Sequence, residues 1–191
     1  SNTIARAIQH AESAVSLEPD LPFAHFALGR LLSRRFIGDL EGAHAAFERA
    51  IALDPNYTDA YAFASIVQIT EGRAEEGLET IEEACARNPV PPYWYFMPLG
   101  LGHYLLGEYE AAEAALTELL DRNPNFLNAM RILMAIYGQT DRADDAQWLA
   151  FEYEALGSPA TITELLNATN VEYAPYRAAI AEGLKLAGLP D

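Results

Sequence analysis

The sequence is built on a repeat of 34 to 36 residues, and this period restricts the fold more than any other feature. Pro19, Pro55, Pro89 and Pro124 follow one another at that spacing, and Ser158 stands one period later. Small residues recur at a fixed distance before these positions, and one such column contains Ala7, Ala43, Gly77, Ala112 and Ala146. Periods of this length are typical of stacked units, none of which can bury its apolar face alone. The chain is therefore expected to be an array of similar units.

Each unit is expected to be a pair of helices joined by a tight turn. Residues spaced three and four apart share one helix face, and small side chains there let a second helix come close. The prolines follow the ends of the second helices, which they cannot continue. Gly38, Gly72 and Gly107 stand at the turns, where glycine adopts backbone angles that other residues resist, and Asp141 takes this place in the last copy. The sequence predicts roughly eleven helices, near 3–17, 22–36, 39–53, 57–70, 73–87, 92–106, 108–121, 125–138, 141–156, 161–168 and 175–187.

Two fragments carry a resemblance to a known family. Gly-Asp-Leu-Glu-Gly-Ala (38–43) and Gly-Glu-Tyr-Glu-Ala-Ala (107–112) resemble the tetratricopeptide repeat, and the resemblance extends over residues 3 to about 157. It implies an all-α fold, a right-handed α-solenoid of helical hairpins. In such a stack the first helix of each hairpin lines the concave face.

The domain organisation follows from the repeat boundaries. Residues 1–158 are expected to hold the repeats, and residues 159–191 to form capping helices, because repeat arrays need an atypical terminal element with a polar outer face. Within the tail, Thr161 to Glu164 is a capping box that opens a short helix. The repeat region is expected to divide into a half repeat and four full repeats, at 3–20, 21–56, 57–90, 91–125 and 126–158.

Charge and composition exclude several classes of partner. The 12 basic and 28 acidic side chains give a net charge of −16, which disfavours binding to nucleic acid and to anionic membranes. No apolar stretch approaches the roughly 18 residues of a membrane-spanning helix. Cys85 is the single cysteine, so no internal disulfide can form. This fits a cytoplasmic protein, and we expect that location.

Motifs for catalysis or cofactor binding are missing from the sequence. It contains no glycine-rich phosphate loop, no Gly-x-Ser-x-Gly elbow, no His-Glu-x-x-His pair and no Cys-x-x-Cys pair. The four histidines fall in different repeats and are interpreted as packing residues: His10, His25, His44 and His103. No nucleophile is paired with a base. We therefore expect no catalysis, no cofactor and no metal ion.

What remains is a surface, and counting off the packing positions assigns a set of side chains to the concave face. These are Phe23, Phe26, Arg30, Arg34, Asp59, Ile66, Trp94, Met97, Leu101, Asn128 and Arg131. Aromatic side chains and arginine are typical of binding hot spots, and repeat arrays bind through their concave surfaces. The pattern predicts a protein or peptide partner in this groove. An alternative of equal weight is that the aromatic side chains fill gaps between neighbouring hairpins.

A second functional hypothesis is a sensor of small ligands. Pro91 and Pro92 begin the fourth hairpin and Pro98 lies inside its first helix, where a proline removes a backbone bond and kinks the helix. The kink would shape a pocket walled by aromatic side chains, namely Trp94, Tyr95, Phe96 and Tyr104. A deep closed pocket would favour the sensor, whereas an open groove would favour the interaction module.

A closer resemblance concerns the context of the chain. The run 100–112 within Pro91 to Pro124, the segment 123–127 and the ending 183–191 are similar to C-terminal repeat regions of bacterial proteins that begin with a class III adenylate/guanylate cyclase domain or a winged-helix DNA-binding domain. This implies a regulatory or scaffolding region of a larger signalling protein. No metal-binding or DNA-binding residue of those domains can be carried over to this chain.

The N-terminus begins within a repeat. The chain starts Ser1-Asn2 without methionine, and we expect it to be a piece of a longer protein. The first expected helix has no partner helix before it, although Ala7, Ala11 and Ala14 form the face that would contact one. A bare apolar stripe favours association. We expect either an upstream helix to cover it in the longer protein or two copies of this chain to bury it as a homodimer.

Overall fold

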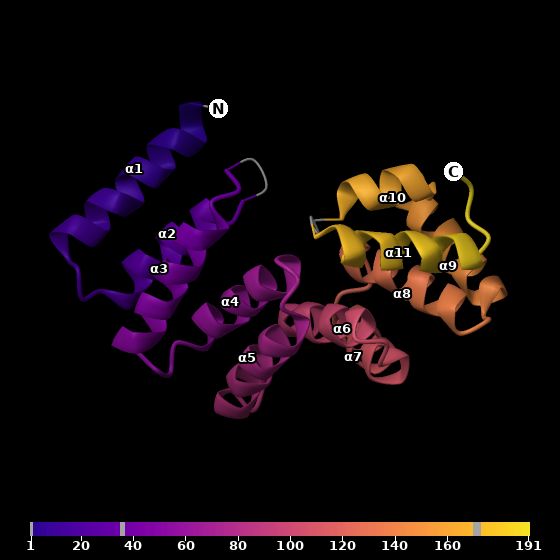
Figure 1. The fold of residues 1–191 in the computed structure, drawn as a ribbon, viewed down its shortest axis with the longest axis horizontal. Helices are drawn as coiled ribbons and strands as arrows, with labels where there is room; N and C mark the ends of the chain where they lie inside the picture. The colour runs from indigo at the N-terminus through magenta and orange to yellow at the C-terminus, as the bar shows by residue number, and fades with distance from the viewer. Residues whose placement is uncertain (1, 35–36, 170–172) are drawn as a thin grey trace.

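The computed structural model describes residues 2–34, 37–169 and 173–191, without the side chain of Asn2 (Figure 1). Over these ranges it contains eleven α-helices, one 3-10 turn and no strand, which confirms the all-helical prediction. The elements are α1 (Asn2–Leu17), α2 (Pro22–Leu32), α3 (Leu40–Leu53), α4 (Thr58–Thr70), α5 (Ala74–Arg87), η1 (Tyr93–Tyr95), α6 (Phe96–Leu105), α7 (Tyr109–Arg122), α8 (Leu127–Gln139), α9 (Ala143–Ala155), α10 (Ile162–Ala168) and α11 (Ala174–Leu186).

Four hairpins make up the array: α2–α3, α4–α5, α6–α7 and α8–α9. The small residues of the repeat lie where the two helices of a hairpin touch, and Ala43, Ala112 and Ala146 are fully buried there. A larger side chain would force the helices apart, because protein interiors are close-packed. The small-residue column therefore has the packing role that the sequence predicted for it.

The turns inside the hairpins also match the prediction. Gly38, Gly72 and Gly107 have positive φ angles of 66°, 95° and 79°. Asp141 takes the same conformation with φ 56°, the one non-glycine residue with a positive φ in the described ranges. A side chain in this conformation usually carries strain, which aspartate tolerates better than most residues.

The α6–α7 hairpin differs from the prediction in how its first helix begins. A kinked helix near 92–106 was expected, but the chain forms the 3-10 turn η1 and then the ten-residue helix α6. Pro98 consequently lies in the first turn of α6, where a missing N–H group interrupts little of the helical hydrogen bonding. Together η1 and α6 span Tyr93–Leu105, close to the predicted range, and the kink at Pro98 stays a prediction. In α2 the helix ends at Leu32, before the expected residue 36, and residues 35–36 lie outside the described ranges.

Three apolar clusters are distributed along the array. One joins α2, α3 and α4 around Phe26 and Phe47, and a second joins α4, α5 and η1 around Ile81 and Tyr95. The largest cluster extends from α6 to α11 and includes Leu165 and residues Ile180 and Leu184 of the C-terminal tail. The burial is thus concentrated towards the C-terminus.

The tail folds back over the array and does not simply extend it (Figure 1). Helix α11 packs against α8, and the Tyr104 hydroxyl of α6 donates to the Ala179 carbonyl at 2.9 Å. Further along, the Tyr176 hydroxyl donates to the carbonyl of Gly72 in the α4–α5 turn at 3.1 Å. The Thr161 hydroxyl accepts the Glu164 N–H at 3.3 Å, as the predicted capping box requires. The boundary between repeats and cap at residue 158 stays a prediction.

Candidate functional site

A row of aromatic rings crosses the inner side of the first two hairpins. The Phe23 and Phe26 rings of α2 lie 6.4 Å apart, and Phe26 is 5.5 Å from Phe63 of α4. Phe63 in turn lies 5.1 Å from Trp94 of η1. The contacts follow from the repeat, since they join the first helices of neighbouring hairpins. Four rings from three elements thus form one row, which we call the aromatic strip. Phe23 is exposed at its end, Phe63 and Trp94 are half-buried, and Phe26 is buried.

Arg30 lies on this strip. Its guanidinium carbon is 4.6 Å from the centre of the Phe63 ring and 5.7 Å from that of Phe26, so it makes cation–π contacts with both. The side chain is exposed, and no carboxylate of the described residues forms an ion pair with it. In a chain of net charge −16, an arginine held by rings and left without such a partner is available for an acidic group on another molecule.

Asp59 supplies the opposite charge nearby. Its carboxylate accepts a hydrogen bond of 2.8 Å from the Tyr95 hydroxyl, which also lies 3.0 Å from the Thr58 hydroxyl. Burial raises the pKa of Tyr95 well above its ordinary value, so the phenol keeps its proton and remains the donor to Asp59 at neutral pH. The half-buried Asp59 is therefore held in place by the third hairpin.

The predicted groove residues differ in how far their side chains are exposed. Phe23 is 61% exposed, whereas Phe26 is buried among Phe47, Tyr57 and Phe63. Leu101 is buried within the C-terminal cluster. Ile66, Trp94 and Met97 are half-buried. The packing interpretation thus applies to Phe26, whereas binding by the exposed Phe23 stays a prediction.

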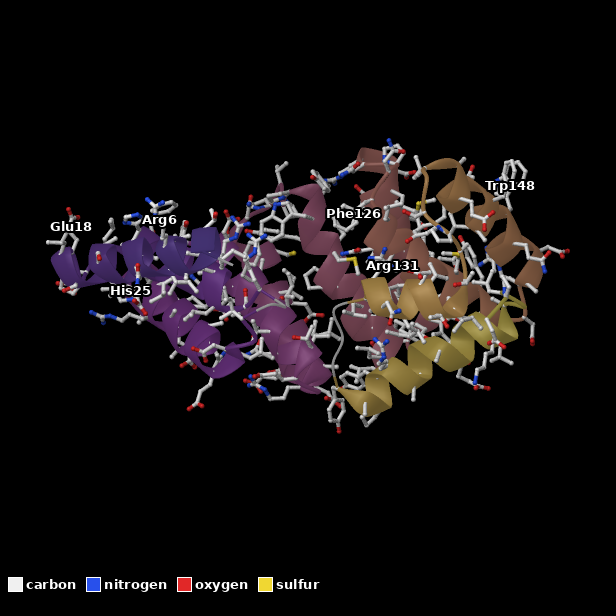
Figure 2. All side chains as sticks on the ribbon, turned by 90° about the horizontal axis from the view of Figure 1, so that it is seen from above. Arg6, Glu18, His25, Phe126, Arg131 and Trp148 are labelled. Atoms are coloured by element: carbon white, nitrogen blue, oxygen red, sulfur yellow. The ribbon has the colours of Figure 1, made fainter. Side chains whose placement is uncertain are left out.

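The remaining predicted groove residues lie away from the aromatic strip. Arg34 is exposed in the turn that follows α2. Arg131 of α8 is only 5% exposed, and its guanidinium donates to Asn128, to the Tyr153 hydroxyl at 3.0 Å and to the Ala168 carbonyl at 3.1 Å. Figure 2 shows it between α8 and the C-terminal helices. The expectation that Arg131 faces an open groove is therefore corrected, because Tyr153 of α9 and Ala168 at the end of α10 hold its buried guanidinium.

Two residues of the site were missed by the sequence prediction. Phe63 contacts Arg30, Phe26 and Trp94, and Tyr57 packs edge-on against Phe26 at 5.0 Å. Phe63 lies one position, and Tyr57 two positions, outside the columns that the repeat assigns to the concave face. An aromatic side chain next to the small pair Ala64-Ser65 was the signal that could have identified Phe63.

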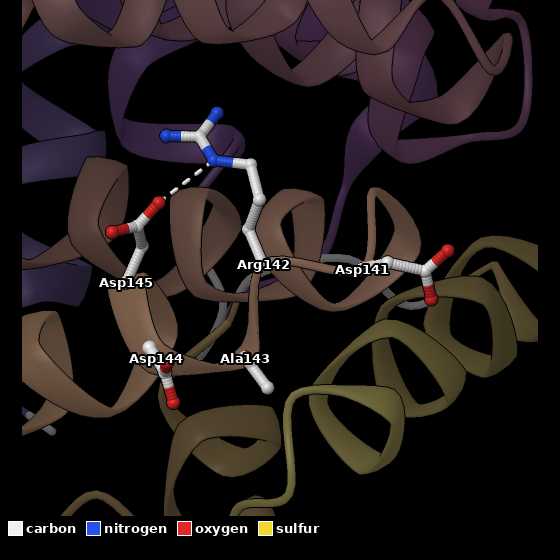
Figure 3. Close-up of a pocket in the computed structure, with 5 residues that line it drawn as sticks. All are labelled: Asp141, Arg142, Ala143, Asp144 and Asp145. Atoms are coloured by element: carbon white, nitrogen blue, oxygen red, sulfur yellow. Dashed lines mark hydrogen bonds and ion pairs between the residues drawn. The ribbon is translucent and has the colours of Figure 1, made fainter.

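The aromatic residues assigned to a sensor pocket are used for packing. Tyr95 and Tyr104 are buried with bonded hydroxyl groups, and Trp94 lies against Phe63. Two shallow hollows of the described chain, at residues 18–21 and 141–145, lie elsewhere and are open to solvent. The second hollow lies where α9 begins, with Arg142 Nε bonded to Asp145 at 2.7 Å (Figure 3). Neither hollow involves the predicted pocket residues.

Side chains that could carry chemistry are dispersed. No group of three or more histidine, cysteine, aspartate or glutamate side chains that could hold a metal ion occurs among the residues placed by the structure. His25 Nε2 is bonded to the Pro19 carbonyl at 2.8 Å, as expected of a packing histidine. Burial, with the charge of Glu82, raises the pKa of the Cys85 thiol, which lowers its reactivity. Of the helices described, none is long and apolar enough to cross a membrane.

The comparisons with known proteins agree with this architecture. The model of the tetratricopeptide repeat family matches residues 38–97, which run from the turn before α3 to the start of α6. No curated protein matches the chain in sequence. The matched segment contains the α4–α5 hairpin and the residues Asp59, Phe63 and Trp94 of the site.

Solved structures share the fold over nearly the whole chain. PilW, a type IV pilus biogenesis factor, superposes with a TM-score of 0.74 at 18% identity, covering 96% of this chain and 82% of PilW. PilF of Pseudomonas aeruginosa superposes with a TM-score of 0.72 at 17% identity, covering 97% of this chain and 82% of PilF. YrrB, described as a tetratricopeptide-repeat protein with an unusual peptide-binding site, superposes with a TM-score of 0.66 at 21% identity. The match covers 95% of this chain and 92% of YrrB. These likenesses show a tetratricopeptide-type helical solenoid.

Proposed function

We propose that this chain is a non-catalytic protein-interaction module that binds a peptide segment of another protein along the aromatic strip. The observation that carries the proposal is the position of Arg30, stacked on Phe63 without a carboxylate partner among the described side chains. Aromatic side chains and arginine dominate binding hot spots because they bury large areas and make directional polar contacts. The peptide-binding site named for YrrB, a protein of the same fold, supports this choice.

The strip defines what the peptide should carry. The exposed Phe23 ring offers an apolar contact, and the neighbouring Arg30 guanidinium offers a charged donor with fixed orientation. A fork of N–H groups suits a carboxylate best. We infer a ligand with an apolar side chain next to an acidic group, either an Asp or Glu side chain or a C-terminal carboxylate. The proposed binding site therefore contains only the part of the predicted groove that lies on α2, α4 and η1.

The test uses peptides selected against the whole chain from a random displayed library and then measured by titration calorimetry. Arg30→Ala should weaken binding of an acidic selected peptide about tenfold or more, which corresponds to about 1.4 kcal/mol. Arg49→Ala is the matched control. Arg49 of α3 is also an exposed arginine, but it pairs with Asp20 at 2.9 Å. It should leave affinity unchanged. An Arg30→Ala protein that binds as tightly as the parent would overturn the proposed site.

Self-association through α1 is a second proposal. Ala7 and Ala14 are half-exposed, although Ala11 between them is buried, whereas Ala43 and Ala112, which match Ala7 in complete hairpins, are fully buried. We propose that the small-residue face of α1 can pair with a second copy of this chain. Sedimentation equilibrium should then show a concentration-dependent dimer that Ala7→Glu abolishes. A monomer at all concentrations would contradict the proposal.

The wider context of the module stays a prediction. The role as a regulatory or scaffolding region of a cyclase-like or winged-helix protein rests on the sequence resemblance, and the cytoplasmic location on the single cysteine. The sequence of the full-length gene product would test both. An N-terminal cyclase or DNA-binding domain would support the context, and an export signal would contradict the location.

A further inference from the structure

A pair of large aromatic side chains lies exposed on α9, away from the aromatic strip. Trp148 and Phe151 are each 65% exposed, and their ring centres are 6.0 Å apart. They lie three residues apart and therefore on one face of the helix. Figure 2 shows Trp148 projecting from the edge of the molecule. Two neighbouring exposed rings of this size form a patch that water solvates poorly.

The repeat itself shows that the array does not require these rings. Trp148 and Phe151 stand two and five residues after Ala146 of the small-residue column. In the other copies the same two places hold Gln9 and Glu12, Ala45 and Glu48, Glu79 and Glu82, and Ala114 and Thr117. Every one of those residues is small or polar. The aromatic pair is thus particular to the last hairpin.

The array's own packing also leaves these places uncovered. Helix α9 buries Ala146, Leu149, Ala150 and Tyr153, which are on its other side. In α7, which has a further hairpin stacked after it, Ala114 and Thr117 are exposed nevertheless. Another repeat stacked beyond α9 would therefore not cover the pair. An occupant has to come from another molecule or another part of a longer chain.

The charges around the rings indicate the chemistry of that occupant. Asp144 and Glu152 lie one helical turn before and after Trp148, and both are exposed. Arg142, the basic residue next to this face, is already held by Glu113 at 2.8 Å and Asp145 at 2.7 Å. Figure 3 shows Asp144 and Asp145 at the start of α9. The rim is therefore negative, in a chain of net charge −16, and a second copy of the same face would be repelled.

We propose that the outer face of α9 is a second docking surface, which binds a basic amphipathic helix of another protein. Apolar side chains on one face of that helix cover Trp148 and Phe151, as in helix recognition through spaced anchors. Lysine or arginine side chains beside them pair with Asp144 and Glu152 and can stack on the Trp148 indole. This surface is on the second helix of the last hairpin, so it can be occupied together with the aromatic strip on the first helices.

The probe is a synthetic helical peptide with leucine on one face and lysine on the other, compared with the same peptide carrying glutamate for lysine. Titration calorimetry should show binding of the lysine peptide and none of the glutamate peptide. The double variant Trp148→Ala/Phe151→Ala should lose about tenfold or more in affinity. Its melting temperature should match that of the parent, since both side chains are mostly exposed. Glu79→Ala/Glu82→Ala, at the matched positions of α5, is the control and should retain binding.

The charge component is tested separately. Asp144→Asn/Glu152→Gln should weaken the lysine peptide several-fold and reduce the dependence of affinity on salt, because exposed ion pairs are screened. The proposal fails if the aromatic double variant binds the lysine peptide as tightly as the parent. Equal binding of the glutamate peptide would also overturn it. Self-association of the parent that disappears in the aromatic double variant would show that a second copy occupies the surface, against the proposed basic partner.

Discussion

The first and last hairpins present their inner faces in opposite ways. On α2 the inner face is open, and Arg30 lies exposed over the Phe63 ring. On α8 the inner face is covered by the C-terminal helices, and Arg131 is buried with its guanidinium bonded to Tyr153 and Ala168. Both arginines stand at positions that the repeat assigns to the concave groove. The position within the repeat therefore sets which way a side chain points. The neighbouring elements then decide whether that side chain is free to bind a partner or is bonded within the fold.

The largest expected effect comes from separating α11 from α8. A Cβ atom at Gly138 would lie 1.9 Å from the carbonyl oxygen of Gly183, so Gly138→Ala cannot be accommodated without moving a helix backbone. Overpacking of this kind costs about 3 kcal/mol in the free energy of unfolding, measured by urea denaturation. Ala178→Val, on the exposed side of α11, is the control and should change stability by less than about 0.5 kcal/mol.

The outcome at Gly138 tests the comparison directly. If α11 holds this face of α8 closed, the variant should also loosen α8 and make the two ends of the array more alike. Hydrogen exchange of the α8 amides should then approach that of α2. An unchanged unfolding free energy would mean that α11 does not pack on α8 as closely as the two glycines indicate.

The repeat made the hairpins predictable, but contacts that lie outside the repeat could not be predicted from it. Each column is a local pattern, and the helix pairs, the buried Ala43 and the turn at Asp141 follow from residues within one unit. The cover over α8 depends on Gly183, which is 45 residues from its contact Gly138 and outside the period. No periodicity encodes such a contact. The sequence therefore predicted the inner-face positions but not that α11 packs on α8.

The site was predictable to the same extent. Phe23, Phe26, Arg30 and Trp94 were assigned to the inner face, and the structure joins them into one strip. Phe63, which links them, lies one position outside the assigned columns. Its contacts with Phe26, Arg30 and Trp94 join its hairpin to both neighbours. Contacts between hairpins cannot be obtained from spacing within a single unit.

A smaller effect is expected from the small-residue column. Ala112 is fully buried between α6 and α7, so Ala112→Leu should destabilise by about 2 kcal/mol through overpacking. Ala7 occupies the same column in α1, which has no preceding helix in this chain and leaves Ala7 half-exposed. Ala7→Leu should be near neutral in thermal or urea unfolding. Equal losses for the two variants would show that α1 is packed as tightly as a complete hairpin.

The smallest effect compares the turns of the first and last hairpins. Gly38 has φ 66° with no atom within 4 Å of the place where a Cβ would stand, so Gly38→Ala adds backbone strain without a clash. A left-handed non-glycine residue costs roughly 1 kcal/mol, and the unfolding free energy should fall by that amount. Asp141 already accepts this strain at φ 56°. Asp141→Gly relieves it but also gives the unfolded chain more freedom, and these opposed effects should leave stability within about 0.5 kcal/mol of the parent. Urea unfolding of both variants would check the pair. A large gain at Asp141→Gly would mean that the last hairpin stores strain that the first does not, whereas a large loss would give the Asp141 side chain a stabilising contact of its own.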